Sequence, residues 1–349
     1  MIPFDHPLVQ RIKGFFSDRN LLRLERAFGI FGICLTFWMI YRLGPSRVAS
    51  DLHRVSWGFF VLVLFKGMET ALETCAWKGI IPPGGNKIGF WEAFKTILEG
   101  NALNYITMTR MGGEPLKAFA FKDRIGLARS TASVIILKFC VLTGFWITIA
   151  GGFIAVLFRA DIPSGVKIRV GLGVLLVTLF LASASWMQSV GLFKPISWVL
   201  KKFEAQKDWM KENLLGITHM DDHLLETYRS RPFRVGFAIL LCTLVWVEEI
   251  FFIWLGLRFL HLDQDWYSAA IVGTLALLLN HLLFFVPWRA GTQEGTMVLA
   301  FTIGDLSEPV GLSVAILKRL RELLWVFLGL IFFALETLKA PDSEAPPSS

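Results

Sequence analysis

The sequence predicts an all-α fold, a polytopic membrane helix bundle with about seven to eight spans. Of its 349 residues, 54% are hydrophobic, and the mean hydropathy of +0.56 is higher than that of ordinary soluble domains. Three uncharged runs, residues 139–158, 170–193 and 266–287, are each long enough to cross a bilayer, which takes about 20 apolar residues. Lys and Arg are concentrated in alternate connecting segments, as expected of a chain that crosses a membrane repeatedly.

Further candidate spans are less uniform in composition. They are residues 27–43, 56–76, 235–257 and 322–338. The third of these would match the strongest runs but for Glu248 and Glu249 near its centre. The three uncharged runs and these four candidates together give seven predicted spans. The number rises to eight if a Gly-broken helix also crosses the membrane.

The distribution of basic residues predicts the orientation of the chain. Lys and Arg are frequent in residues 1–26, 77–130 and 194–234 and sparse in the connections between them. By the positive-inside rule, this places the N-terminus in the cytoplasm. The formal net charge of +7 is therefore a topology signal, and we expect no nucleic-acid partner.

The domain organisation is simple because no Pro/Gly/Ser linker divides the chain. We expect an amphipathic N-terminal surface helix over residues 1–26 and a single transmembrane domain over residues 27–338. Within it, the polar segment 194–234 should form amphipathic helices on the cytoplasmic membrane surface. The tail 339–349 is expected to be disordered.

An internal repeat is indicated by two pairs of similar stretches. "EPLKAFAF" (114–121) resembles "EGTMVLAF" (294–301), and "SVIILK" (133–138) resembles "SVAILK" (313–318); both pairs are displaced by 180 positions. We infer two related units, about 90–158 and 266–338, each with a Gly-broken helix. They are parallel or inverted depending on whether the broken helices cross the membrane or turn back within it.

The polar breaks themselves are candidate binding sites. "TRMGGEPLKAF" and "FFVPWRAGTQEG" each place a Glu after glycines at a predicted helix start, where backbone N–H groups are unpaired. The matching polar residues are Asn104, Arg110 and Glu114 in the first unit and Asn280, Arg289, Gln293 and Glu294 in the second. Arg could bind a phosphate, since a guanidinium holds oxyanions bidentately. Alternatively, each Glu caps its own helix and each Arg reaches the membrane interface.

Other charges lie within predicted spans. Lys66, Glu69 and Glu73 share one helix face, which should line a cavity or form internal ion pairs. Glu248 and Glu249 sit near a span centre, where a charge costs about 2.5–3.5 kcal/mol. We expect at least one of these two to be protonated or paired, and the alternatives are a structural salt bridge and a functional site.

The stretch "LKRLRELLW" (317–325) supplies further charges at a predicted helix start. It contains Lys318, Arg319, Arg321 and Glu322, which either anchor the helix at the interface or contact phosphate. If one of the glutamates of residues 235–257 is paired, the expected partner is a cation such as Lys138 or Lys318. "HMDDH" (219–223) could hold a metal but is better explained as a polar surface helix, so no metal and no cofactor are expected.

Four stretches carry a resemblance to a known family: "RMGGEPLKAFAF", "EEIFFIWLGLRFL", "FFVPWRAGTQEG" and "LKRLRELLWVFLGLIFF". Over about residues 25–338, the chain resembles the lysylphosphatidylglycerol synthase transmembrane (flippase-like) family, including its hopanoid-associated branch. It departs from the usual pattern in having Trp288-Arg289 in place of a glycine pair, and Lys138 where an acidic-basic pair is more usual. The resemblance implies a lipid-translocating or lipid-handling domain in the bacterial inner membrane.

Three functions remain as hypotheses. The first is a lipid transporter whose intramembrane cavity binds an anionic or polar headgroup; its expected residues are Arg110, Glu114, Glu248, Glu249, Arg289, Gln293, Glu294, Lys318, Arg319, Arg321 and Glu322, supported by Lys66, Glu69, Glu73, Asn104, Lys138 and Asn280. The second is a lipid-modifying enzyme with Glu114 or Glu294 as base. The third is a non-catalytic membrane partner of such an enzyme. Family members that aminoacylate phosphatidylglycerol carry a soluble transferase domain, which this chain of 349 residues does not contain, so we expect no aminoacyl transfer by it.

Overall fold

The computed structural model describes residues 45–81, 88–107, 112–157, 230–262, 264–283 and 291–339, together with the single positions 38, 41 and 168. Several predicted features lie outside these residues: the surface helix 1–26, the span 170–193, nearly all of segment 194–234, the tail from residue 340, and both Arg110 and Arg289.

Every regular element in the described part of the chain is a helix, which agrees with the predicted all-α class. In order they are α3 (Pro45–Val55), α4 (Gly58–Ile80), α5 (Phe90–Ile106), α6 (Gly113–Ala120), α7 (Lys122–Ile125), α8 (Leu127–Leu157), α12 (Pro232–Phe259), α13 (Trp266–Leu282), α14 (Thr292–Ile303) and α15 (Glu308–Lys339). The local sequence explains several starts. Pro232 opens α12 and the Asp265 side chain caps α13 by accepting a hydrogen bond from the Ser268 amide at 3.1 Å.

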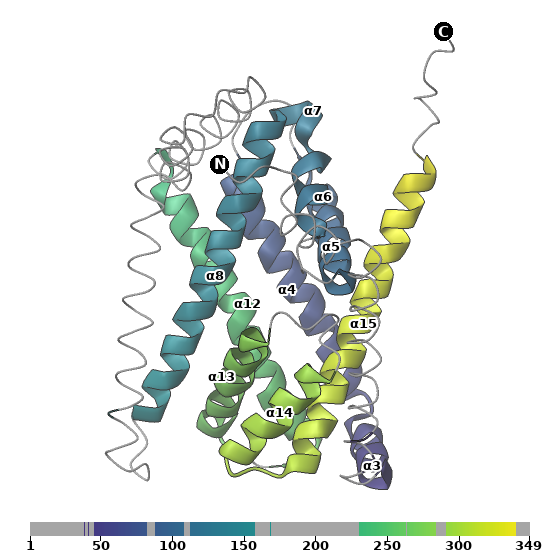
Figure 1. Cartoon of the computed structure of the whole chain (residues 1–349), viewed down its shortest axis with the longest axis vertical. Coiled ribbons are helices and arrows are strands. Elements are labelled where there is room, and N and C mark those ends of the chain that lie inside the picture. Colours follow the sequence, from purple (N-terminus) through teal and green to yellow (C-terminus); the bar gives the residue numbers. More distant parts are fainter. Residues whose placement is uncertain are drawn as a thin grey trace, which may run out of the picture.

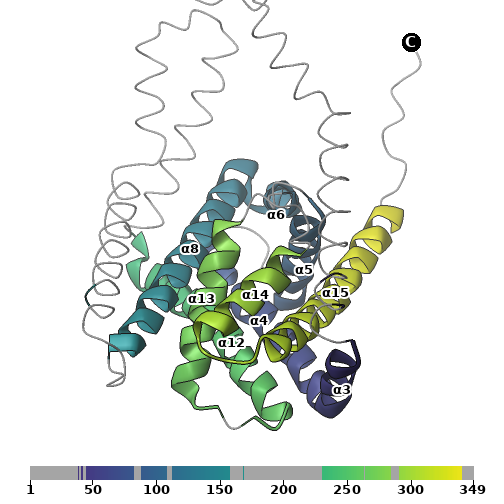
Figure 2. The ribbon, with the colours of Figure 1, turned by 60° about the horizontal axis from the view of Figure 1, so that its bottom comes forward.

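The long helices run through the bundle in both directions. In Figure 1, α4 and α15 ascend, whereas α8 and α12 descend. Two shorter hairpins lie between them: α5 and α6 occupy the upper half of the bundle, and α13 and α14 occupy the lower half. Figure 2 shows α13, α14 and α15 in front of α4 and α12. Each hairpin therefore occupies one half of the bundle and does not extend through it.

Helix packing is closest at glycines and small residues. A Cβ added to Gly113 of α6 would lie 1.9 Å from the Gly100 carbonyl oxygen of α5, so only glycine fits at this hairpin contact. Gly152 of α8 approaches α13 in the same way, and Gly329 of α15 approaches α5. Helices α8 and α15 thus each pack tightly against the hairpin that belongs to the other half of the sequence.

Among the residues that the structure describes, two helices, Leu127–Ala155 and Pro232–Phe259, are long and apolar enough to cross a membrane, and a third candidate is formed by α3 and α4 if the pair is taken as one span bent by 75°. The uncharged run 266–287 does not form one helix. Residues Trp266–Leu282 form α13, which at 17 residues is shorter than the roughly 20 needed for a span.

The two largest buried apolar clusters fill the two halves of the bundle. One joins α4, α5, α8 and α12 around Trp77, Phe121 and Leu137. The other joins α12, α13, α14 and α15 around Phe252, Phe301 and Val314. Polar side chains collect between these clusters.

Candidate functional site

A cavity of about 400 Å³ lies within the bundle and is lined by residues of both halves. Helices α4, α5, α8, α12, α13 and α15 all contribute to its wall. Its charged lining residues are Lys66, Glu69, Glu73, Lys138, Glu249 and Glu322, and its aromatic ones are Tyr105, Trp246, His281 and Trp325. Backbone and side-chain groups of this kind are tolerated inside a membrane protein where they line a polar cavity.

The break between α5 and α6 is closed by side chains. Asn104 accepts a hydrogen bond from the Gly113 amide at 2.8 Å and donates one to Glu114 at 2.8 Å. Lys138 of α8 pairs with the same carboxylate at 2.7 Å. Glu114 lies in the first turn of α6 and links this short helix to the neighbouring helices α5 and α8 through Asn104 and Lys138.

A second group of charges connects α4 with this hairpin. Asn101 donates to Glu73 at 2.9 Å, and Lys117 donates to Asn101 at 2.9 Å. The Lys117 ammonium also lies 3.5 Å from Glu73, and its side chain is only 1% exposed. On the same face of α4, Lys66 and Glu69 form the expected ion pair at 2.6 Å.

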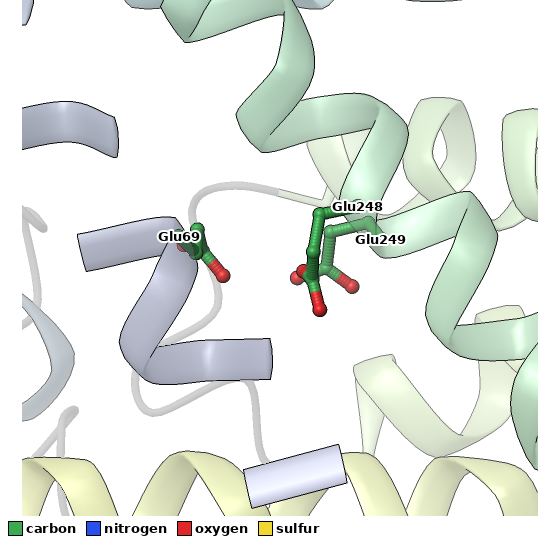
Figure 3. Close-up of side chains that lie close together, drawn as sticks. All are labelled: Glu69, Glu248 and Glu249. Atoms are coloured by element: carbon green, nitrogen blue, oxygen red, sulfur yellow. The ribbon is translucent and has the colours of Figure 1, made fainter. Parts of the chain in front are cut away.

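Three carboxylates meet where α4 crosses α12 (Figure 3). Glu69 faces Glu248 and Glu249, and their nearest oxygens all lie within 4.8 Å of one another. Such a group could hold a metal by geometry alone. Here, Lys66, Lys318 and Arg321 supply the compensating positive charge.

Arg321 is the principal cation of this crossing. It is fully buried, lies 2.7 Å from Glu248 and 3.3 Å from Glu249, and its guanidinium stacks 3.8 Å above the Phe252 ring. Lys318 pairs with Glu249 at 2.8 Å, as expected for one of the two candidate lysines. Several opposite charges close together offset the cost of burying each one.

The start of α14 differs from the start of α6. Glu294 is fully buried and forms two contacts with Arg319, one of them between Nη2 and Oε2 at 2.9 Å. The Arg319 Nη1 atom also donates to the Tyr105 hydroxyl of α5 at 3.2 Å. Within the described part of the chain, neither end of the Gln293 amide has a hydrogen-bond partner, and the same holds for the Asn280 Oδ1 atom.

The aromatic walls of the cavity are held in place by the backbone. The Trp246 indole N–H donates to the Val141 carbonyl at 2.8 Å, and the Trp325 indole N–H donates to the Val63 carbonyl at 2.9 Å. His281 stacks on Phe145 with ring centroids 3.9 Å apart. These contacts fix the orientation of the three rings relative to the cavity.

The structure therefore brings most of the predicted residues into one connected region, although Arg110 and Arg289 are not among the residues described. Sequence reasoning missed Asn101, Tyr105 and Lys117. Helical spacing could have found two of them, because Asn101 precedes Asn104 by three positions and Lys117 follows Glu114 by three.

The model of a known protein family, described as the lysylphosphatidylglycerol synthase TM region, matches residues 27–330, most of the chain. The chain belongs to this family. Membership confirms the predicted resemblance and makes this an integral membrane protein whose function is related to membrane lipids. No curated protein and no solved structure matches the chain.

Proposed function

We propose that this member of the lysylphosphatidylglycerol synthase TM family carries a polar-headgroup lipid across the bacterial inner membrane. The observation that carries the proposal is the charged cavity of about 400 Å³ inside an apolar helix bundle, lined by both halves of the chain. Charged residues within membrane segments usually mark a substrate pathway. The headgroup would enter this cavity while the acyl chains stay in the bilayer.

We further infer that the two halves are inverted repeats, each one helix longer than the sequence suggests. In this scheme α4, α5, α6 and α8 correspond to α12, α13, α14 and α15. Figure 1 supports it, because each helix runs opposite to its counterpart. The interhelical contacts follow the same correspondence. The contact of α5 with α15 is equivalent to that of α13 with α8, and the contact of α4 with α15 is equivalent to that of α12 with α8.

The sequence offset fits the same correspondence. Glu69 and Glu249 are separated by 180 positions, the same displacement as the two similar stretches, and both sit where α4 crosses α12. Helices α5 and α13 would then be re-entrant, entering the membrane from opposite sides. Inverted repeats with broken helices are a recurrent architecture of transporters, with the substrate bound at their interface. We expect about seven to eight spans, with the N-terminus in the cytoplasm.

The charged residues in and beside the cavity can be given roles. Lys138, whose side chain is 46% exposed, is the most accessible cation of the site and would contact the lipid phosphate. Arg319 offers a planar guanidinium beside Tyr105 for a second contact. When the site is empty, Glu114 and Glu294 pair with these cations, so that no charge is left uncompensated. Binding would exchange a carboxylate for a phosphate.

The test is transport of headgroup-labelled lipid by purified protein in liposomes. Glu114→Gln and Glu294→Gln should each lower the transport rate by at least about tenfold, because each removes the partner that orients a phosphate-binding cation. Glu92→Gln is the matched control, since Glu92 pairs with Arg124 at 2.8 Å in an exposed ion pair outside the cavity. Equal rates in all three variants would refute the assigned site.

Two other functions make different predictions. An enzyme acting on the headgroup would change the chemistry of the lipid, which mass spectrometry of the liposome lipids would detect. A non-catalytic partner of a lipid-modifying enzyme would move no lipid itself and would tolerate both Gln variants. The ion-paired cavity favours transport over either alternative, because it supplies a polar route rather than an obvious nucleophile.

A further inference from the structure

Equivalent lysines of the two halves are paired with non-equivalent carboxylates. At the 180-position displacement, each half carries the same three charged positions: Glu69, Glu114 and Lys138 in the first, and Glu249, Glu294 and Lys318 in the second. In the first half, the lysine pairs with the carboxylate of the short helix α6, at 2.7 Å. In the second half, the lysine pairs with the carboxylate at the α4–α12 crossing, at 2.8 Å.

The equivalent lysines of the two halves also differ in how far their side chains are exposed. The Lys138 side chain is 46% exposed, whereas that of Lys318 is 6% exposed. Helix α5 lines the cavity with Leu98, Asn101 and Asn104 among others, whereas His281 is the lining residue from α13. The cavity is therefore formed mainly on the side of the first hairpin, and the second hairpin is packed closed.

We propose that Lys138 and Lys318 exchange carboxylates between two states of the protein. In the second state, Lys138 leaves Glu114 for Glu69, and Lys318 leaves the α4–α12 crossing for Glu294. Each half then takes the arrangement that the other half has here, so the cavity closes beside α5 and opens beside α13. Two packings of inverted repeats around a fixed site are the geometry of alternating access.

The exchange strands no buried charge. When Lys318 leaves, Glu249 keeps Arg321 at 3.3 Å, and when Lys138 leaves, Glu114 keeps its hydrogen bond from Asn104 at 2.8 Å. Removing the sole partner of a buried charge is strongly destabilising, so pairs that retain a second partner are suited to switching. The polar residues at the start of α14 that have no partner here would face the newly opened cavity.

The test compares thiol accessibility at two equivalent positions, with the four native cysteines replaced by alanine. Leu98→Cys reports the state described here, because Leu98, although only 3% exposed, lines the cavity, whereas Thr274 does not. Thr274→Cys reports the second state. Thr274 is 1% exposed, and it corresponds to Leu98 at the displacement that relates Asn104 to Asn280. Labelling with a water-soluble maleimide is measured in lipid nanodiscs, where both faces are accessible.

Four carboxylate variants bias the exchange in opposite directions. Glu114→Gln and Glu249→Gln weaken the pairs seen here, so each should raise the labelling of the Thr274→Cys protein relative to the Leu98→Cys protein by at least about fivefold. Glu69→Gln and Glu294→Gln weaken the pairs of the second state and should lower that ratio. The double variant Glu114→Gln/Glu69→Gln should return the ratio toward that of the parent.

Opposite shifts by the two pairs of variants would support the exchange. Shifts in one direction by all four, or no shift in any, would overturn it. A folding control is monodisperse elution of every variant, and the double variant remains informative if one single variant fails to fold. The inference rests on the proposed transport function for its purpose. Labelling needs no lipid substrate, so a failure of lipid transport and a failure of the exchange are separate results.

Discussion

Replacing Arg321 with methionine would test whether the buried charges at the α4–α12 crossing hold the bundle together. The guanidinium is fully buried, lies 2.7 Å from Glu248 and stacks 3.8 Å from the Phe252 ring. Methionine keeps much of the aliphatic volume but removes the charge. Glu249 would retain Lys318 at 2.8 Å, whereas Glu248, with a side chain 1% exposed, would lose the cation that contacts it.

The expected loss follows from that geometry. Removing one partner of a buried ion pair costs about 3–5 kcal/mol, because the other charge stays buried and uncompensated. For a chain of this size, each kcal/mol lowers the melting temperature by roughly 2 °C, so Arg321→Met should lower it by about 6–10 °C. The assay is thermal unfolding of purified protein in one detergent, followed by fluorescence.

The second variant separates charge from packing. In Arg321→Met/Glu248→Gln, the stranded carboxylate becomes a neutral amide, so at least half of the lost melting temperature should return. If the single variant melts within about 2 °C of the parent, the ion pair does not hold the crossing together and the reasoning is refuted. If the double variant is no more stable than the single one, the loss comes from packing on Phe252 instead.

Three further predictions concern the α5–α6 hairpin and the wall of the cavity. Gly113→Ala should lower the melting temperature sharply, because its Cβ would lie 1.9 Å from the Gly100 carbonyl oxygen; Gly295→Ala, which meets no atom within 4 Å, is the matched control and should not. Lys117→Met should cost about 1–3 kcal/mol in chemical unfolding, since Glu73 and Asn101 lose the buried ammonium group that contacts them; unchanged unfolding would show that these contacts are dispensable. Trp246→Phe removes one hydrogen bond to a backbone carbonyl of α8 and should cost about 0.5–1.5 kcal/mol in the same assay; a much larger loss would mean that the indole packs as well as donates.

Helical periodicity allowed part of the site to be predicted. The spacing of Lys66, Glu69 and Glu73 placed them on one face of a helix, and that face does form internal ion pairs and line the cavity. Glu248 and Glu249 interrupted an otherwise apolar run, which required a compensating cation, and Lys318 is one of the two that were anticipated. Such local patterns can be recognised in the sequence because a charged side chain buried in an apolar segment is costly unless a partner compensates its charge.

Long-range pairing could not be predicted in the same way. The sequence left Lys138 as a candidate partner for the glutamates of α12, whereas it lies 2.7 Å from Glu114. The contact between Arg319 and Tyr105 joins residues that no periodicity relates. Likewise, the run 266–287 carries no Asp, Glu, Lys or Arg to mark an end, and only the observed end of α13 at Leu282 shows where the helix stops. Such features depend on how distant helices cross.

The packing of α15 against α5 has a consequence for how the protein is made. The polar hairpin of α5 and α6 is synthesised well before the α15 surface that covers α5 at Gly329. Until α15 emerges, part of the hairpin has no protein against which to pack in the bilayer. Membrane insertion must therefore keep the hairpin sheltered, or held at the interface, until α15 arrives. The hairpin is thus fully packed only after α15 has left the ribosome.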